Sequence, residues 1–348
     1  MMFDSYKIEI EENPAILANL RSMGLAMGIL FLCIMQAHAH TSLPGYLALQ
    51  ETGPGAFDLV WKVPTAEGPP PAIYPEFPST CKITKPLVIE PSAGAMIERG
   101  SIQCGPNGLT GTPIAITGLN VTILDVLVRI NFADGSSVEH MLNPLETSFV
   151  VHKDGKNRID AWGYVKLGVG HIIYGIDHLL FVLGLLLIVR GARLLFKTIT
   201  AFTVAHTITL GLAAFGVVHV APTPVEAVIA LSIVFLAVEL AQHHRGIDGL
   251  TYRQPWIVAF AFGLLHGFGF AGTLFRLGIP SRDIPQALLF FNLGVESGQL
   301  AFVAVFLCFV YSLQTLEIHW PVWAQRIPSY AIGGLASFWF IQRCEIIF

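Results

Sequence analysis

The chain has 348 residues, of which 53% are hydrophobic and only 13% are charged. Soluble globular proteins carry about 25% charged residues, so this composition indicates an integral membrane protein. The formal net charge of −4 argues against nucleic acid as a partner. The 5 cysteines include no CxxC pair, which excludes a zinc-ribbon or thioredoxin-type motif.

Residues 1–39 are predicted to be a leader that ends in a secretory signal peptide. Arg21 precedes a short apolar core, and Ala37 and Ala39 form an A-x-A cleavage site. The core is too short to favour an uncleaved membrane anchor. Cleavage after Ala39 would make His40 the mature N-terminus, where its amine and imidazole suit a metal such as copper. The alternative is that cleavage simply falls at this histidine, because one ligand residue makes no site.

Residues 40–160 are predicted to form a small all-β domain, exported to the periplasm. Its expected strands are separated by turns rich in Pro, Gly, Asn and Asp, and they are 45–51, 56–64, 85–91, 111–119, 125–132, 136–142 and 148–152. Short strands at this spacing are typical of a β-sandwich. Cys81 and Cys104 are the only cysteines of this segment, and export to an oxidising compartment favours a disulfide between them.

Residues 161–348 are predicted to form a polytopic α-helical membrane bundle. Six hydrophobic spans are expected, at 165–189, 198–219, 223–242, 255–275, 285–312 and 328–342. His171 in the first span has a counterpart in His266 of the fourth, which suggests two halves of three spans. An odd number of spans in each half would make this 3+3 repeat inverted, as in many transporters.

Positive charges predict how the bundle is oriented. Arg190 and Lys197 follow the first span, and Arg245 and Arg253 lie between the third and fourth spans. These connections should face the cytoplasm, whereas the loop 217–224, which has no Lys or Arg, should face outside. This orientation agrees with an exported N-terminal domain and predicts a multi-pass protein of the bacterial inner membrane.

Ionisable and amide side chains recur inside the predicted spans, where they are costly and usually functional. His171 and His178 are seven residues apart, which places them on nearly one helix face, although Gly170 and Gly175 allow a local distortion. A single such group often only connects neighbouring helices, but the set is too large for that explanation alone. The candidate metal ligands are His171, Asp177, His178, His206, Glu239, His266 and Glu296, with Thr203, Asn292 and Gln299 as supporting polar residues.

Charge balance indicates what these groups bind. Asp177, Glu239 and Glu296 are carboxylates, and no span interior supplies a Lys or Arg to pair with them. Three unpaired buried anions are very unfavourable, so they must be protonated or matched by a cation. Imidazole and carboxylate ligands without a thiolate suit a divalent ion such as Ni²⁺, Co²⁺, Zn²⁺ or Fe²⁺. The expected partners are therefore the lipid bilayer and a metal ion.

Two glycine pairs, Gly263/Gly267 and Gly294/Gly298, have the GxxxG spacing. Small residues at this spacing allow helices to approach closely in a membrane. We therefore expect the fourth and fifth spans to pack tightly against their neighbours. Helix packing alone is enough to explain these glycines.

The motifs "HIIYGIDH", "FTVAHTITL", "FGLLHGFGFA" and "FNLGVESGQ" resemble those of the HupE/UreJ family. These are hydrogenase- and urease-accessory membrane proteins regarded as nickel or cobalt permeases, here in the branch with an exported domain. The resemblance implies that His171, Asp177 and His178 form the family's first motif. The second motif departs from the family pattern, because no Glu follows His266-Gly267, and Glu239 or Glu296 would have to supply that acid.

The leading hypothesis is a permease rather than an enzyme. A divalent ion would first meet the His171–Asp177–His178 motif and then an inner site near His206, Glu239, His266 and Glu296. No P-loop motif is present, so an ion gradient or the membrane potential would drive transport. One alternative is a haem or redox protein, against which carboxylates adjoin the histidines and CxxCH is absent. The absence of HExxH argues against an intramembrane zinc protease.

Another alternative is a metallochaperone or assembly factor for a membrane or periplasmic metalloenzyme. In that case the exported domain would deliver metal to a metalloenzyme or maturation partner. Its histidines His40, His140 and His152 would then be the important ligands.

Overall fold

The computed structural model describes residues 44–65, 70–92, 95–106, 108–153, 159–218, 220–276, 283–314 and 326–347. Contacts divide the chain into two compact units. Within the described ranges, the β unit comprises residues 44–167, 276 and 283–290, and the helical unit comprises residues 168–275 and 291–347. The predicted leader 1–39, its cleavage site and His40 lie outside the described residues.

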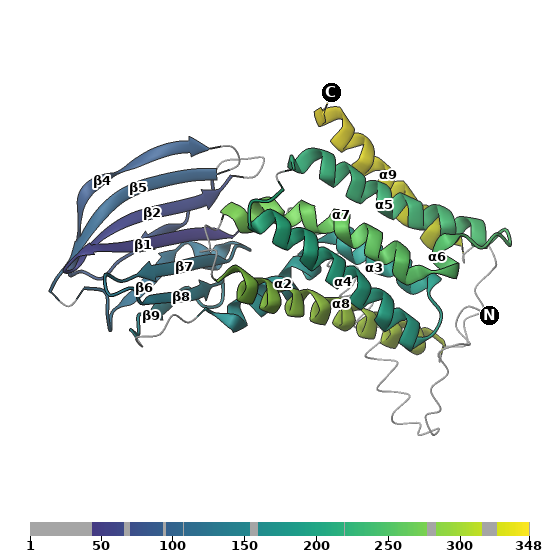
Figure 1. Ribbon diagram of the computed structural model, residues 1–348, viewed down its shortest axis with the longest axis horizontal. Coiled ribbons are helices and arrows are strands. Elements are labelled where there is room, and N and C mark those ends of the chain that lie inside the picture. The colour runs from purple at the N-terminus through teal and green to yellow at the C-terminus, as the bar shows by residue number, and fades with distance from the viewer. Residues whose placement is uncertain are drawn as a thin grey trace, which may run out of the picture. The chain divides into compact units, whose positions relative to one another are not determined.

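The β unit contains two sheets (Figure 1). The larger has the strand order β4-β5-β2-β1-β7-β8 and the smaller has the order β3-β6-β9. Neighbouring strands are antiparallel except for the parallel pair β1 and β7. The bounds are β1 Gly45–Gly53, β2 Ala56–Pro64, β3 Tyr74–Glu76, β4 Cys81–Ser92, β5 Ala95–Cys104, β6 Pro113–Thr117, η2 Leu119–Val121, β7 Val126–Asn131, β8 Ser137–Leu142 and β9 Ser148–Val150.

Alternating side chains build the core of this unit. In β2, Phe57, Leu59 and Trp61 are buried while the residues between them are more exposed, as the two-residue period of a strand requires. They pack with Ile114 and Ile116 of the smaller sheet in one apolar cluster. The N-terminal region is thus an all-β unit whose core draws on both sheets.

The predicted strands are present, but β3 and β5 were not predicted. In β5, Glu98, Arg99 and Gln103 interrupt the apolar alternation that would have identified the strand. Cys81 and Cys104 are opposite each other across β4 and β5 and form a disulfide, as predicted. The link therefore fastens the edge strand β4 to its neighbour.

Helices occupy all six predicted span positions. Their bounds are α2 Ala161–Tyr174, α3 Ile176–Ile188, α4 Ala192–Ala214, α5 Pro222–His243, α6 Leu250–Arg253, α7 Pro255–Arg276, α8 Ile284–Gln314 and α9 Ile327–Ile347. Within the described part of the chain, α4, α5 and α8 provide three helices long and apolar enough to cross a membrane, or four if the bent pair α2–α3 is one span. Six crossings and the inverted repeat stay predictions.

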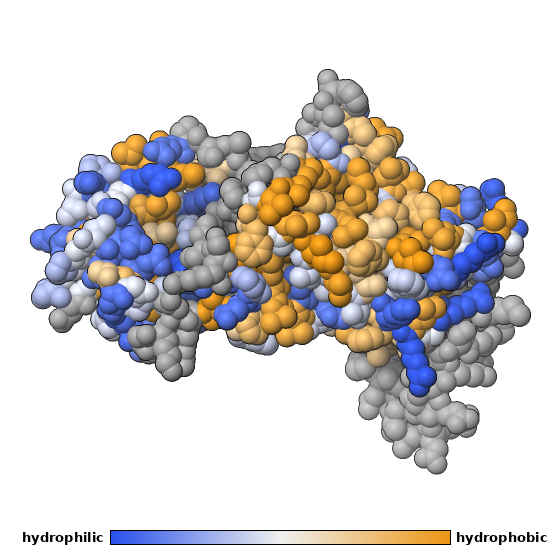
Figure 2. All heavy atoms as spheres, viewed as in Figure 1, coloured by the Kyte–Doolittle hydropathy of each residue, from blue (hydrophilic) through white to orange (hydrophobic). Residues whose placement is uncertain are grey.

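The surface of the helical unit is strongly apolar. Figure 2 shows hydrophobic residues over most of its visible face. Val204, Ile208 and Leu212 are exposed at intervals of four along α4, and Leu231 and Phe235 are exposed on α5. Exposed apolar stripes of this kind are rare on soluble proteins and indicate contact with lipid.

Cationic residues gather at one end of the helical unit. A guanidinium nitrogen of Arg190, just after α3, lies 3.3 Å from Nε2 of His243 at the end of α5. The ammonium of Lys197 in α4 lies 4.4 Å from the ring centroid of Trp256 in α7. The two connections that were predicted to share one side of the membrane therefore lie together.

Candidate metal centre

The first histidine motif folds around a break in the helix. His171 lies in the last turn of α2 and His178 in the first turn of α3, and the two helices bend by 74° at Gly175. The bend falls at Gly175, one of the two glycines at which a local distortion of the helix was expected. Seven residues of straight helix rise about 10 Å, whereas the two ring centroids are only 4.6 Å apart. The bend is what brings the imidazoles together.

Only glycine fits at the break. A Cβ atom on Gly175 would lie 2.6 Å from the carbonyl oxygen of His171 and 2.9 Å from Nδ1 of His178. Asp177 then stands in the first turn of α3, where a carboxylate interacts favourably with the helix dipole. Its Oδ1 accepts a hydrogen bond from the backbone N–H of His178 at 2.9 Å.

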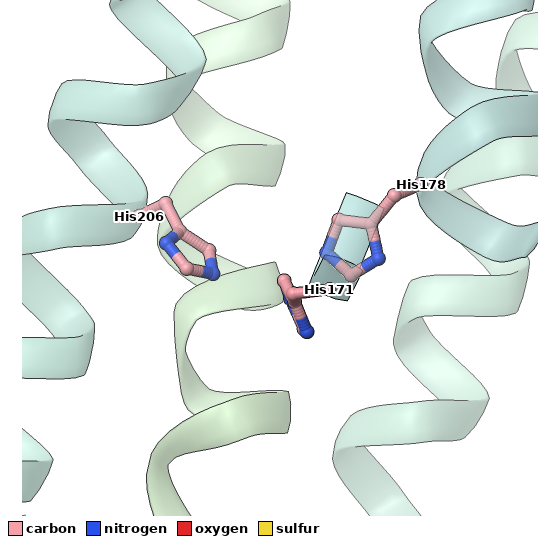
Figure 3. Close-up of side chains that lie close together, drawn as sticks. All are labelled: His171, His178 and His206. Atoms are coloured by element: carbon pink, nitrogen blue, oxygen red, sulfur yellow. The ribbon is translucent and has the colours of Figure 1, made fainter. Parts of the chain in front are cut away.

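Three imidazoles from different helices converge in the helical unit. His171 of α2, His178 of α3 and His206 of α4 lie close together (Figure 3), and each offers a ring nitrogen within 4.8 Å of the others. His178 and His206 are buried. His266 of α7 is also buried, and its ring centroid is 5.2 Å from that of His178. Four predicted histidines therefore form one cluster, called the imidazole cluster below.

The Nδ1 atoms of three of these rings each face an oxygen. The distances are 3.0 Å from His178 to Asp177 Oδ1, 3.1 Å from His206 to Asn292 Oδ1, and 2.9 Å from His266 to the carbonyl of Phe262. The Nε2 atoms of the same three rings are buried and have no hydrogen-bond partner among the described residues. A neutral ring that donates through Nδ1 keeps a lone pair on Nε2, which is the form that binds metal.

Glycines place the histidine of α7 against α4. A Cβ on Gly263 would lie 2.4 Å from the carbonyl oxygen of Phe202, and one on Gly267 would lie 2.1 Å from Oγ1 of Thr209 and 2.5 Å from the carbonyl oxygen of His206. The predicted close packing of this glycine pair is confirmed. This close packing puts the backbone beside His266 in contact with the turn of α4 that carries His206.

The second glycine pair makes a similar contact between α8 and α2. A Cβ on Gly298 would lie 3.2 Å from Cβ of Ile172, and one on Gly168 would lie 3.0 Å from Cα of Gly294. This helix crossing holds α8, which carries Asn292, beside the part of α2 that carries His171.

Two further predicted ligands, Glu239 and Glu296, have hydrogen-bond partners outside the imidazole cluster. The carboxylate of Glu239 is buried and accepts the backbone N–H groups of Leu250 at 2.8 Å and Thr251 at 2.7 Å, so it caps the short helix α6. Glu296 accepts the hydroxyl of Thr200 at 2.6 Å. Glu239 therefore has a structural role at α6, and an inner site that includes Glu239 and Glu296 stays a prediction.

The remaining supporting residues connect α4 with α8. Oγ1 of Thr203 donates to Oε1 of Gln299 at 3.2 Å, and both side chains are buried. This pair fits the expectation that some polar groups only connect helices. Asn292 differs from Gln299 because its partner is an imidazole.

The histidines of the β unit are partnered separately. Nε2 of His140 lies 3.1 Å from a carboxylate oxygen of Glu146, and Nδ1 of His152 lies 2.9 Å from the carbonyl of Val150. Among the residues that the structure describes, the only group of three ligand side chains close enough for one metal ion is that of His171, His178 and His206.

The sequence did not point to a buried ion cluster in the β unit. The guanidinium of Arg129 contacts the carboxylate of Glu139 and lies 3.0 Å from that of Asp283, and all three side chains are at most 14% exposed. Burial raises the pKa of Glu139 to about 7, although the positive charge of Arg129 opposes this. The available signal was a single arginine inside the apolar strand Val126–Asn131.

An apolar helical unit with a buried cluster of metal-binding side chains defines an integral membrane protein with a candidate metal centre. The family model described as HupE / UreJ protein matches residues 146–343, more than half of the chain. The chain therefore belongs to the HupE/UreJ family, as the motifs predicted. A comparison with curated proteins found no match.

Proposed function

We propose that this protein is a permease for a divalent transition metal ion, with Ni²⁺ or Co²⁺ as its main substrate. The observation that carries the proposal is the convergence of His171, His178 and His206, whose ring nitrogens lie within 4.8 Å of one another. Family membership supports a role with nickel or cobalt. His266 is next to this group and provides a fourth imidazole.

The chemistry of the cluster selects a class of ion. Neutral nitrogen donors without thiolates favour Ni²⁺, Co²⁺, Cu²⁺ and Zn²⁺ over Mg²⁺ and Ca²⁺, which prefer oxygen ligands. The carboxylate of Asp177 lies 3.0 Å from Nδ1 of His178, so it would supply a negative charge close to a bound ion. A single nearby carboxylate leaves a divalent ion only partly neutralised, which favours its release onward.

The helix break also supports transport. Non-helical backbone at membrane depth is tolerated where it lines a cavity, and transporters often bind substrates where spans are interrupted. Here the break at Gly175 lies between His171 and His178. We place the protein in the bacterial inner membrane, with six crossings and the disulfide-linked β unit in the periplasm.

The full-length protein in detergent provides the test. Wild type, His178→Ala and Cys308→Ala would be exposed to a mixture of Mn²⁺, Co²⁺, Ni²⁺ and Zn²⁺ and analysed for bound metal, and the same proteins in liposomes would be assayed for nickel uptake. Cys308 is an exposed free thiol and serves as the control.

We expect wild type and Cys308→Ala to retain and transport Ni²⁺ or Co²⁺. His178→Ala should weaken binding about a hundredfold or more and stop uptake, because it removes a ligand. Equal metal content and uptake in all three proteins would refute the proposed site. Binding without any uptake would instead favour a metallochaperone.

A further inference from the structure

The amide side chain of Asn292 contacts the imidazole cluster at His206. It lies on α8, is 5% exposed, and its Oδ1 is 3.1 Å from Nδ1 of His206. His206 is itself fully buried, and its Nε2 has no hydrogen-bond partner among the described residues. The two ring nitrogens of His206 are thus in very different surroundings.

This difference determines which nitrogen carries the proton. A neutral imidazole has one N–H and one lone pair, and a hydrogen bond to one nitrogen fixes the role of the other. Donation from Nδ1 to the oxygen of Asn292 leaves the lone pair on Nε2. The other tautomer would bury an Nε2–H group that no described residue accepts, and an unsatisfied buried donor is unfavourable. Asn292 therefore favours the metal-binding form.

We propose that Asn292 is a positioning residue that holds His206 in the tautomer and orientation in which Nε2 binds the transported ion. The proposal rests on the proposed function, because it assumes that His206 is a ligand. Outer hydrogen bonds of this kind typically change metal affinity 10- to 100-fold.

The identity of the acceptor sets how tightly the ion is held. His178 donates to a carboxylate, whereas His206 donates to a neutral amide. A carboxylate makes an imidazole a stronger ligand than an amide does. A neutral partner for His206 therefore keeps the affinity moderate, which suits an ion that has to leave the site.

The experiment uses full-length protein in detergent and Co²⁺ alone as the probe, followed by its visible absorption. Four variants are compared with wild type. His206→Ala removes the ligand, Asn292→Leu removes the acceptor, and Asn292→Asp replaces the acceptor by a carboxylate. Gln299→Leu is the matched control, because it removes a buried amide of the same helix whose partner is Thr203.

We expect Asn292→Leu to weaken Co²⁺ binding 10- to 100-fold and Gln299→Leu to change it by less than about threefold. Asn292→Asp should bind Co²⁺ at least as tightly as wild type and release it more slowly. A role limited to helix packing would not produce this tighter binding.

The outcomes separate the two proposals. If His206→Ala binds Co²⁺ as wild type does, His206 is not a ligand and the proposed metal site is wrong. If His206→Ala loses binding while Asn292→Leu does not, only the positioning role is overturned. Should Asn292→Leu fail to fold, a folded Asn292→Asp that binds Co²⁺ more weakly than wild type would overturn it as well.

Discussion

The buried ion cluster of the β unit and the imidazole cluster of the helical unit both place polar groups in apolar surroundings. The first contains charged partners, with Arg129 between the carboxylates of Glu139 and Asp283. It becomes neutral when one carboxyl group is protonated, and burial raises the pKa of Glu139 to about 7. The second contains rings such as His178 and His206 whose Nε2 atoms have no partner in the described part of the chain.

The comparison shows how a structural cluster differs from the proposed binding site. A proton and a guanidinium inside the β unit are sufficient to complete the ion cluster. The imidazole cluster has neighbouring ring nitrogens, and under the proposed function a cation from outside would complete it. Buried acceptors left without partners cost free energy, and the proposed cation would remove that cost.

The largest expected effect comes from breaking the ion cluster at Arg129. Arg129→Met would leave two carboxylates buried together without a positive charge. Removing one partner of a buried ion pair typically costs about 3–5 kcal/mol. We therefore expect a large fall in the thermal midpoint of the full-length protein in detergent, measured by intrinsic fluorescence.

The Co²⁺ affinity of folded Arg129→Met provides the control for this prediction. It should match that of wild type, because the ion cluster supplies no metal ligand. An altered affinity would contradict the separation of a structural cluster from a binding site.

A smaller effect should appear in the pH dependence of stability. The pKa of Glu139 is raised from 4.5 to about 7, so the folded state holds this proton more tightly than the unfolded state does. Its contribution to stability is full below about pH 4.5 and is lost as the pH rises through 7, by about 3 kcal/mol. Arg129, Asp283, Asp160 and Tyr164 influence this group.

Glu139→Gln isolates that contribution because its amide does not titrate. We expect wild type to lose stability relative to Glu139→Gln between about pH 5 and pH 8. Thermal midpoints of both proteins at several pH values measure the difference. A difference that is the same at every pH would show that Glu139 does not exchange a proton in this range.

The sequence predicted the helices, most strands, the disulfide and the family, because each has a local signal. Apolar runs marked the helices, and paired cysteines in an exported segment marked the Cys81–Cys104 link. The strand 95–104 was missed because Glu98 and Arg99 interrupt its alternation. This strand was therefore missed because its own local pattern is irregular.

Other features depend on contacts between distant residues and had no local signal. The distance from His171 to His178 follows from a 74° bend, and Gly175 indicated a distortion but not its angle. Glu239 was predicted to be a metal ligand, but in the fold its carboxylate accepts hydrogen bonds from two backbone N–H groups. Asp283 is 154 positions from Arg129, so no local pattern of the sequence pairs them.

The smallest effect tests whether Asp177 supports His178 or binds the ion itself. In the structure its Oδ1 lies 3.0 Å from Nδ1 of His178. Asp177→Asn keeps an oxygen at this position but loses the charge, so we expect Co²⁺ affinity to fall only about tenfold, the lower end for an outer hydrogen bond.

Titration with Co²⁺ of Asp177→Asn beside His178→Ala and Cys308→Ala measures this effect. Cys308→Ala should match wild type, since its thiol is exposed. A loss in Asp177→Asn as large as that in His178→Ala would mean that the carboxylate is a direct ligand. The imidazole cluster would then bind its ion through the negative charge of Asp177, as the carboxylates of the β unit bind Arg129. The two clusters would differ only in their cation, which is a metal ion in one and an arginine of the chain in the other.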